Sequence, residues 1–492
     1  MKRSVKNMVL AFSVLLAFLL VYQIWFNSYL LPDGYRYLTS GIENHIIKPI
    51  ANFLSPKKSG DFSQNLKALL KPEKIVLQYS GERRAFSNDA AGYVQAQSLA
   101  ESTMEHVMNG DYALKSKETV TMDSYFSTLK GKSVYVDYGK NCDYRLFSFA
   151  LCGKIKNSFT DDISIINGYI ISLHDGILND VSIYMIDQKS ETVYRYVVEA
   201  EKNELDTQLK NIMAQSESLS TLSYSFELNF HKEQAESPTK VIFAPMLLLD
   251  LQTQTMPSVS SSPVVGADHA MADDMLDALL SAFSINTRTM NKYVDLDNAR
   301  VFIENNATLT IYPNGLLQYQ AVQGGHGPDI SAGADKTNYD IYSATANAVD
   351  FVTNLCGYVP SEIFEHLQIS SALVNDSAKQ GSYTICFDYC IDGRPVRYKE
   401  GESYYHTIEI EIENGFLQSY RQVLKTYEKH HDEVLTLQPM LNAADALVDM
   451  LYVGDQPVNI TSMHAGYVDE LSDTILAKWN AVANGSEYMH CR

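Results

Sequence analysis

The stretch Asn314-Gly315-Leu316-Leu317-Gln318 recurs one hundred residues later as Asn414-Gly415-Phe416-Leu417-Gln418. Each Asn-Gly pair lies between two segments in which apolar and polar residues alternate, at 301–312 and 317–321 in the first copy and at 406–412 and 417–424 in the second. Because Asn-Gly supplies the two positive φ angles of a type I′ turn, Asn314-Gly315 and Asn414-Gly415 predict two β-hairpins. A repeated hairpin indicates a repeated structural module.

Helices are predicted in front of these sheet segments. Apolar residues at helical spacing predict them around residues 275–283, 348–355 and 443–451, and Ser343 is the expected N-cap of the second. A third pair, Asn484-Gly485, predicts a smaller hairpin near the end of the chain. The simplest interpretation is an α+β protein whose last two parts, a helix and sheet domain at 268–430 and a helix and sheet module at 431–492, resemble each other.

Composition limits the possible functions. The chain has 492 residues, and 39 basic against 59 acidic side chains leave a formal charge of -20. Affinity for a polyphosphate depends on clustered Lys and Arg, so this balance argues against nucleic acid as a partner. With 46% hydrophobic and 11% aromatic residues the chain buries sizeable cores, which excludes global disorder and favours two or three domains.

An uncharged run near the start predicts a membrane anchor. Residues 8–26 (MVLAFSVLLAFLLVYQIWF) span roughly 28 Å as a helix, close to the thickness of the bilayer hydrocarbon. Lys2, Arg3 and Lys6 precede this run, and the first acidic residue is Asp33, so residues 1–7 are expected in the cytoplasm and the rest of the chain outside. The alternative is a cleaved signal peptide, but no A-x-A-like site follows the run. We therefore predict a single-pass protein of the cell membrane.

The outer part is predicted to begin with a juxtamembrane connection at 27–70 and an α+β domain at 71–251. Within this domain, helices are expected at 92–108 and 201–213, and strands at 75–79, 133–138, 144–151, 163–173, 181–186, 193–198 and 241–251. Residues 252–267 (QTQTMPSVSSSPVVGA) contain Pro257, Pro263 and a serine cluster. This composition predicts a linker and a domain boundary.

No pattern of residues predicts catalysis. Ser127-x-x-Lys130 lacks the companion motifs of acyl-serine enzymes, and Gly131-Lys132-Ser133 lacks the first glycine of a phosphate-binding loop. The cluster Glu428, His430, His431, Asp432 and Glu433 is interpreted as a solvated connection rather than a metal site, because adjacent histidines in an extended chain point to opposite sides. We predict a protein that is not an enzyme, with no cofactor and no metal.

The cysteines give one open question. Cys142 and Cys152 either bridge a hairpin outside the cell or remain two free thiols, and the sequence favours neither. Cys386 and Cys390 share one face of a predicted strand about 13 Å apart, which is too far for a disulfide between them.

The order of features resembles a known family of regulators. The features are the charged N-terminus with one span, the segments 300–303 (RVFI) and 314–319 (NGLLQY), the helix end 351–357 (FVTNLCG), the strand 383–391 followed by 392–396 (DGRPV), the hairpin 407–424, and the segments 443–447 (AADAL), 464–467 (HAGY) and Lys478-Trp479. They resemble the YycH and YycI accessory regulators of the WalK (YycG) sensor histidine kinase, and the large domain before the linker makes the chain YycH-like. One departure is Ala477, where such chains often carry a proline two residues before the tryptophan.

The resemblance implies a regulator of the cell-wall-related WalK/WalR (YycG/YycF) two-component system that acts by protein contact. Its partners would be a WalK-like kinase, a YycI-like paralogue and the lipid bilayer. Ser13 and Ala17 share one face of the predicted anchor and are the expected contacts with the kinase's membrane helices. Whether the effect is activation or inhibition stays open.

Two alternatives come from other classes of protein. One is an extracytoplasmic module, chaperone-like, that binds a peptide or cell-wall ligand and has no kinase partner. The other is an anchored hydrolase, which would need a nucleophile and a base that meet near His326 or His430.

Overall fold

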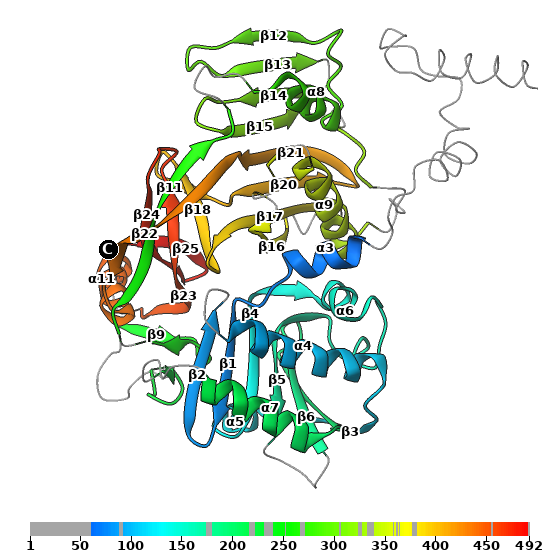
Figure 1. Cartoon of the computed structure of the whole chain (residues 1–492), viewed down its shortest axis with the longest axis vertical. Helices are drawn as coiled ribbons and strands as arrows, with labels where there is room; N and C mark the ends of the chain where they lie inside the picture. Colours follow the sequence, from blue (N-terminus) through cyan, green and yellow to red (C-terminus); the bar gives the residue numbers. More distant parts are fainter. Residues whose placement is uncertain are drawn as a thin grey trace, which may run out of the picture. The chain divides into compact units, whose positions relative to one another are not determined.

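The computed structural model describes residues 61–87, 92–173, 180–215, 222–230, 240–250, 252–265, 271–304, 307–322, 327–331, 339–357, 359–360, 363, 365–375, 381–453 and 456–490. Residues Gly60–Ile285 and Lys292–Arg492 form one compact unit. Two large sheets with helices packed against them make up this unit, so the predicted α+β class is confirmed (Figure 1). No helix in these ranges is long and apolar enough to cross a membrane, and the anchor predicted at residues 8–26 lies outside them.

The first sheet has seven strands, and every neighbouring pair is antiparallel. The strands lie in the order β2-β1-β4-β5-β6-β7-β3. Their bounds are β1 (Lys74–Tyr79), β2 (Glu82–Ser87), β3 (Leu114–Val120), β4 (Ser133–Asp143), β5 (Ile165–Ser172), β6 (Asp180–Asp187) and β7 (Thr192–Glu199). Helices α4 (Tyr93–Asn109) and α7 (Lys202–Gln215) pack on each other and on β1.

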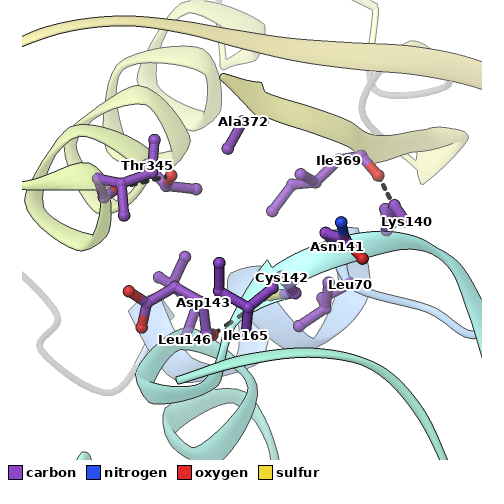
Figure 2. A pocket seen from close by; sticks show the side chains of 11 residues that line it. Leu70, Lys140, Asn141, Cys142, Asp143, Leu146, Ile165, Thr345, Ile369 and Ala372 are labelled. Atoms are coloured by element: carbon purple, nitrogen blue, oxygen red, sulfur yellow. Dashed lines mark hydrogen bonds between the residues drawn. The ribbon is translucent and has the colours of Figure 1, made fainter. Parts of the chain in front are cut away.

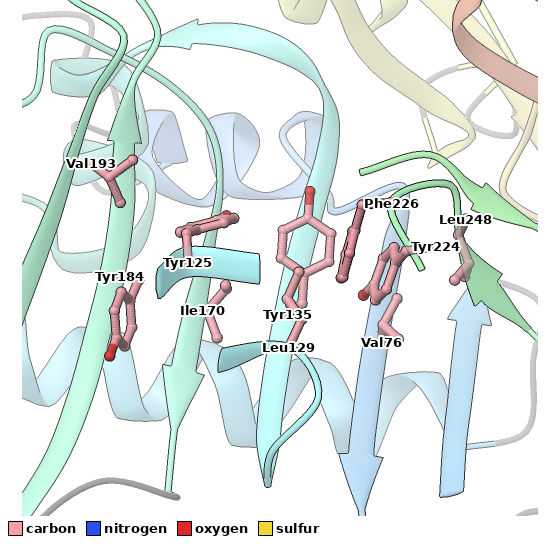
Figure 3. Close-up of a cluster of buried hydrophobic side chains, with 10 residues drawn as sticks. All are labelled: Val76, Tyr125, Leu129, Tyr135, Ile170, Tyr184, Val193, Tyr224, Phe226 and Leu248. Atoms are coloured by element: carbon pink, nitrogen blue, oxygen red, sulfur yellow. The ribbon is translucent and has the colours of Figure 1, made fainter. Parts of the chain in front are cut away.

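Aromatic side chains fill both faces of this sheet. On one face Tyr125 of α5 (Met122–Thr128) packs with the strand residues Tyr135 and Tyr184, and the rings of Tyr224 and Phe226 complete the cluster (Figure 3). Tyr224 lies in the short strand β8 (Ser223–Tyr224), and Phe226 follows it. Strand β8 pairs with β10 (Leu248–Leu249). The other face receives α6 (Tyr144–Cys152), whose Phe147 ring lies 5.9 Å from that of Tyr169.

The second sheet has fourteen strands. The main path is β12-β13-β14-β15-β21-β20-β17-β18-β23-β24-β25, and β16, β19 and β9 pair beside it with β17, β18 and β23. The strands are β9 (Val241–Phe243), β12 (Asn291–Val294), β13 (Arg300–Glu304), β14 (Ala307–Ile311), β15 (Leu316–Ala321), β16 (Leu367–Val374), β17 (Ser382–Ile391), β18 (Arg394–Glu400), β19 (Ser403–Tyr405), β20 (Ile408–Glu413), β21 (Phe416–Val423), β23 (Val458–Asp469), β24 (Ile475–Ala483) and β25 (Ser486–His490).

The two copies of the Asn-Gly repeat meet in this sheet, because β15 of the first copy pairs with β21 of the second. Helix α8 (Asp273–Ala282) is followed by Phe283, whose ring stacks on Tyr319 at 5.0 Å and meets Tyr420 edge-on at 5.3 Å. Helix α9 (Ile341–Cys356) contributes Phe351, 5.7 Å from Tyr420. The repeat therefore builds one shared core rather than two separate ones. Helix α11 (Met440–Leu451) packs on β23, and α3 (Asp61–Leu69), at the end of the predicted juxtamembrane connection, packs on α6 and α9.

The turns of the two copies differ. Asn414 and Gly415 both have positive φ angles, 50° and 83°, and join β20 to β21. In the first copy only Gly315 has a positive φ, 89°, and its N–H donates to the carbonyl of Tyr312 at 3.0 Å. Pro313 causes this difference, because its fixed φ near -65° begins the turn one residue earlier than a type I′ turn at Asn314-Gly315 would.

The strand predicted at 144–151 is wrong, since these residues form helix α6. Asp143 caps its start, where Oδ1 accepts a hydrogen bond from the backbone N–H of Arg145 at 2.9 Å. Gly153, at φ 67°, ends it. These capping residues on both sides outweigh the β propensity of the aromatic residues between them.

The linker predicted at 252–267 contains a strand, β11 (Gln254–Pro263), paired with the long strand β22 (Lys425–Leu437). Its prolines occupy positions that a strand tolerates. Pro257 lies at an irregularity in the register, and Pro263 is the last residue of the strand. The predicted limit at residue 430 falls inside β22, so both predicted connections are strands of one ribbon, and residues 428–430 are solvent-exposed within it.

Three smaller expectations also differ from the structure. The segment 301–312 divides into the separate strands β13 and β14, and the segment 241–251 divides into β9 and β10. The N-cap of α9 is Asp340, whose Oδ1 accepts hydrogen bonds from both the N–H and the hydroxyl of Ser343 at 2.9 Å. Ser343 thus takes part in the cap as a donor.

A buried ion pair fixes the ribbon β11–β22 to the second sheet. Lys425 and Asp469 are 1% and 0% exposed, and their charged atoms lie 2.9 Å apart. The Lys425 ammonium also donates to Ser261 Oγ and to the carbonyl of Ser472, while Tyr427 donates to the Asp469 carboxylate. Every hydrogen of the ammonium therefore has an acceptor.

We expect Lys425→Met to lower the free energy of unfolding by about 3–5 kcal/mol, because it leaves the Asp469 carboxylate buried without its cation. The matched control is Lys429→Met, further along the same strand. The partner of Lys429, Asp392, lies near the surface, so loss of this ion pair should lower the free energy of unfolding by less than about 1 kcal/mol. Urea titration followed by circular dichroism measures both. Equal losses for the two variants would contradict the structural role of the pair.

Candidate functional site

Seven charged or titratable side chains, Glu73, Lys140, Asp388, Arg397, His406, His464 and Glu487, line a cleft between the start of β1, the middle of β4 and one end of the second sheet. The cleft has a volume of about 330 Å³ and continues into a second cleft of about 400 Å³. Glu73, Gly393, Pro395 and His464 line both. This size lies within the range of small-molecule sites in proteins.

Asp388 of β17 is the centre of the charge network. Its carboxylate forms an ion pair with Arg397 of β18 and accepts from His406 Nδ1 at 3.0 and 3.2 Å. The backbone N–H of Thr407 also points to Oδ1, at 3.4 Å. The side chains of Asp388 and Arg397 are 4% and 7% exposed, so these charges are buried together.

The network continues to the last hairpin. Arg397 Nε donates to Glu487 Oε1 of β25 at 3.0 Å, and Asn480 Nδ2 of β24 donates to the same oxygen at 2.6 Å. Asn480 Nδ2 also lies 3.3 Å from His464 Nε2. The Glu487 carboxylate can only accept, so the Asn480 atom that contacts it is the amide nitrogen, which is a donor. His464 Nε2 is therefore the acceptor in the Asn480–His464 pair.

The network holds its members in fixed charge states. Burial disfavours a charged imidazole, yet the Asp388 carboxylate raises the pKa of His406 to about 10. Burial also acts to raise the pKa of Asp388, but the Arg397 and His406 cations hold it well below its usual range. Burial raises the pKa of the neighbouring Cys390 thiol to about 12. None of these groups is a base or a nucleophile near neutral pH.

The opposite wall of the cleft comes from an irregular part of β4. The pairing of β4 with β5 is interrupted between Asp137 and Cys142, where Gly139 has a φ of 65° and donates its N–H to Asp137 Oδ1 at 2.8 Å. Lys140 follows, and its ammonium donates to the carbonyl of Ile369 in β16. Burial raises the pKa of Asp137 to about 6 despite the nearby Lys74.

Lys140 also borders a smaller, mostly apolar cavity of about 90 Å³ (Figure 2). Figure 2 shows side chains from α6, α9, β4, β5 and β16 around it, together with Leu70 just after α3; they include Cys142, Leu146, Ile165, Thr345, Ile369 and Ala372. Burial raises the pKa of the Cys142 thiol to about 12, so this thiol is unreactive.

The residues singled out from the sequence lie elsewhere. Asn314, Gly315, Asn414 and Gly415 form hairpin ends of the second sheet and do not line the cleft. Ser13, Ala17 and His326 lie outside the described residues. Cys142, Cys152, Cys386 and Cys390 are all free thiols, which answers the open question on the first pair.

The cluster at 428–433 belongs to β22, and the described side chains of the chain contain no group of three ligands able to hold a metal. His430 Nε2 does lie 2.9 Å from Ser260 Oγ on the ribbon β11–β22. His430 is exposed there, and its position on an open ribbon gives no cleft for a substrate. The contact between His430 and Ser260 is the kind that the hydrolase alternative requires, but no described pocket surrounds it.

Sequence reasoning missed the charge network. Its signal was present in Asp388, a carboxylate inside an otherwise apolar strand, and in Arg397 on the next strand. Buried charges are rare unless they are paired, so such a carboxylate predicts a partner.

The fold and the cleft define a class, an α+β protein of two mainly antiparallel sheets with a cleft lined by charged side chains. No family model matches the sequence, and no curated protein matches it. Among solved structures the chain is similar to YycH from Bacillus subtilis, with 14% identity, a TM-score of 0.54, and coverage of 86% of this chain and 96% of that chain. The resemblance predicted from the sequence is confirmed at the level of the fold.

The raised pKa of His406 gives a prediction for stability against pH. The folded protein holds a proton on His406 up to about pH 10, whereas the unfolded chain releases it near 6.5. This contribution is complete below pH 6.5 and declines as the pH rises toward 10. We expect urea midpoints between pH 6.5 and 10 to fall less steeply for His406→Gln than for the wild type. Parallel declines in the two proteins would contradict the assignment.

Proposed function

We propose that the chain is a membrane-anchored, extracytoplasmic accessory regulator that modulates a WalK-like sensor histidine kinase by protein contact. The observation that carries this proposal is the similarity of fold to YycH over most of both chains. The features at residues 1–30 and 270–492 that resemble the YycH and YycI regulators support it independently. A YycI-like paralogue is the proposed second partner.

The uncharged run at residues 8–26 supports the membrane location. Its length suits one crossing, and the basic residues before it favour a cytoplasmic N-terminus. The lipid bilayer is then a partner of the chain, and the sheets lie outside the cell.

The chemistry of the cleft supports binding over catalysis. Asp388, Arg397 and His406 are committed to one another, and their pKa values keep each in a single charge state near neutral pH. A regulator of this kind needs no chemical step. It needs only a higher affinity for one signalling state of the kinase than for the other, which shifts the population toward that state.

The cleft itself favours a second candidate function. Its volume and polar lining suit an extracytoplasmic module that binds a peptide or cell-wall ligand without a kinase partner. The two candidates differ in whether the chain contacts a kinase in the membrane.

A test of kinase contact is photo-crosslinking in the host membrane. The full-length chain is compared with a variant in which residues 8–26 are replaced by a span of leucines, which keeps the protein in the membrane and keeps its orientation. We expect selective crosslinks to one kinase, and fewer of them from the leucine variant. A full-length chain that is present in the membrane but forms no crosslink to any kinase would overturn the proposal in favour of the ligand-binding module.

Single substitutions test the predicted face of the anchor. Ser13 and Ala17 lie one helical turn apart, so a large side chain at Ala17 should separate the packed helices. We expect Ala17→Phe to lower the crosslink yield several-fold, while the control Ala11→Phe, on another face, leaves it near that of the wild type. Equal losses from both variants would show that this face is not the contact.

A further inference from the structure

Two opposite charges face the cleft of about 330 Å³ and form no direct ion pair with each other. Lys140 of β4 and Glu73, just before β1, are both half-buried and both line it. Among the described residues neither side chain forms an ion pair, and the ammonium of Lys140 has only the carbonyl of Ile369 as a hydrogen-bond acceptor. An ammonium has three donors and a carboxylate about four acceptor positions, so both groups have unused capacity.

The other charges of the cleft are already paired. Asp388 and Glu487 are neutralised by Arg397 and His406 and accept hydrogen bonds from them or from Asn480. Of the three carboxylates and three cations that line the cleft, Glu73 and Lys140 are therefore the two left over. The sum of all six charges is zero, so a ligand of net charge zero fits better than an anion or a cation.

The Glu73 carboxylate lies directly against Gly139. A Cβ on Gly139 would lie 1.8 Å from Glu73 Oε2, so a side chain at this position would force the carboxylate to move. The same glycine has a φ of 65°, a conformation that side chains disfavour, and it directs Lys140 into the cleft wall. Gly139 thus lies beside both charges, and a substitution there is expected to disturb the Glu73 carboxylate.

We propose that this cleft binds a small zwitterion, an amino acid or short peptide with both ends charged, whose carboxylate contacts Lys140 and whose ammonium contacts Glu73. This site is independent of the proposed kinase contact. It adds a soluble ligand of defined chemistry to the proposed protein and membrane partners.

The contact energies follow from charge and burial. In a half-buried cleft an ion pair is screened less than at the surface, so each end of the ligand gains more than an exposed salt bridge would supply. A ligand with only one charged group satisfies one partner and leaves the other unpaired. Binding should therefore need both groups on the same molecule.

The test is isothermal titration calorimetry on the full-length chain in nanodiscs, with glycine, alanine and glycylglycine as probes. The probes are used at up to about 10 mM, because a small ligand held by two contacts is expected to have a dissociation constant up to this range. Acetate and methylamine, each carrying one of the two charges, are the matched controls. We expect saturable binding of at least one zwitterion and at least tenfold weaker binding of both controls.

Variants locate the site. Glu73→Gln, Lys140→Met and Gly139→Ala should each weaken zwitterion binding tenfold or more, and Lys154→Met, an exposed lysine outside the cleft, should leave it unchanged. Gly139→Ala changes no charge, so it keeps the test valid if a charge variant unfolds, which circular dichroism reports. Absence of binding by all three zwitterions, or binding that survives Glu73→Gln and Gly139→Ala in folded protein, would overturn the proposal. Either failure leaves the kinase crosslinks unaffected, so the two proposals are tested separately.

Discussion

The burial of the Asp388 carboxylate is the constraint on which the rest of the second sheet depends. A carboxylate inside a sheet is costly unless cations and donors surround it, and here Arg397, His406 and the N–H of Thr407 do so. Arg397 in turn donates a hydrogen bond to the Glu487 carboxylate, and Asn480 donates to the same carboxylate. The last hairpin is therefore attached to the central strands by charge as well as by strand pairing.

This attachment helps to explain why residues Gly60–Ile285 and Lys292–Arg492 form one compact unit rather than a series of modules. The repeated hairpins pair through β15 and β21, and β18 pairs with β23 in parallel, so the predicted modules merge into one sheet. The ribbon β11–β22 is fixed to the same sheet by Lys425 and Asp469. A ligand or partner that contacts one part of such a sheet meets a pre-organised surface, which lowers the entropic cost of binding.

The sequence predicted the hairpin turns correctly where no neighbouring residue altered the Asn-Gly turn. Asn414-Gly415 and Asn484-Gly485 adopt the two positive φ angles expected, whereas Pro313 changed the turn at Asn314-Gly315. The aromatic residues of Tyr144–Cys152 favour a strand by propensity, but the caps Asp143 and Gly153 make this segment a helix. The charge network could not be assembled from the sequence, because its partners come from separate strands. Arg397 of β18 contacts Glu487 of β25 although β23 and β24 lie between these two strands in the order of the sheet.

The central claim is that the chain works by binding a kinase, and that its charged groups serve recognition and structure. The most direct test is the rate of kinase autophosphorylation in nanodiscs that contain the host WalK-like kinase, with and without the full-length chain at saturating concentration. The account predicts a change in this rate, of either sign, that is smaller when residues 8–26 are replaced by leucines. A rate that stays the same at every concentration of the chain would contradict it.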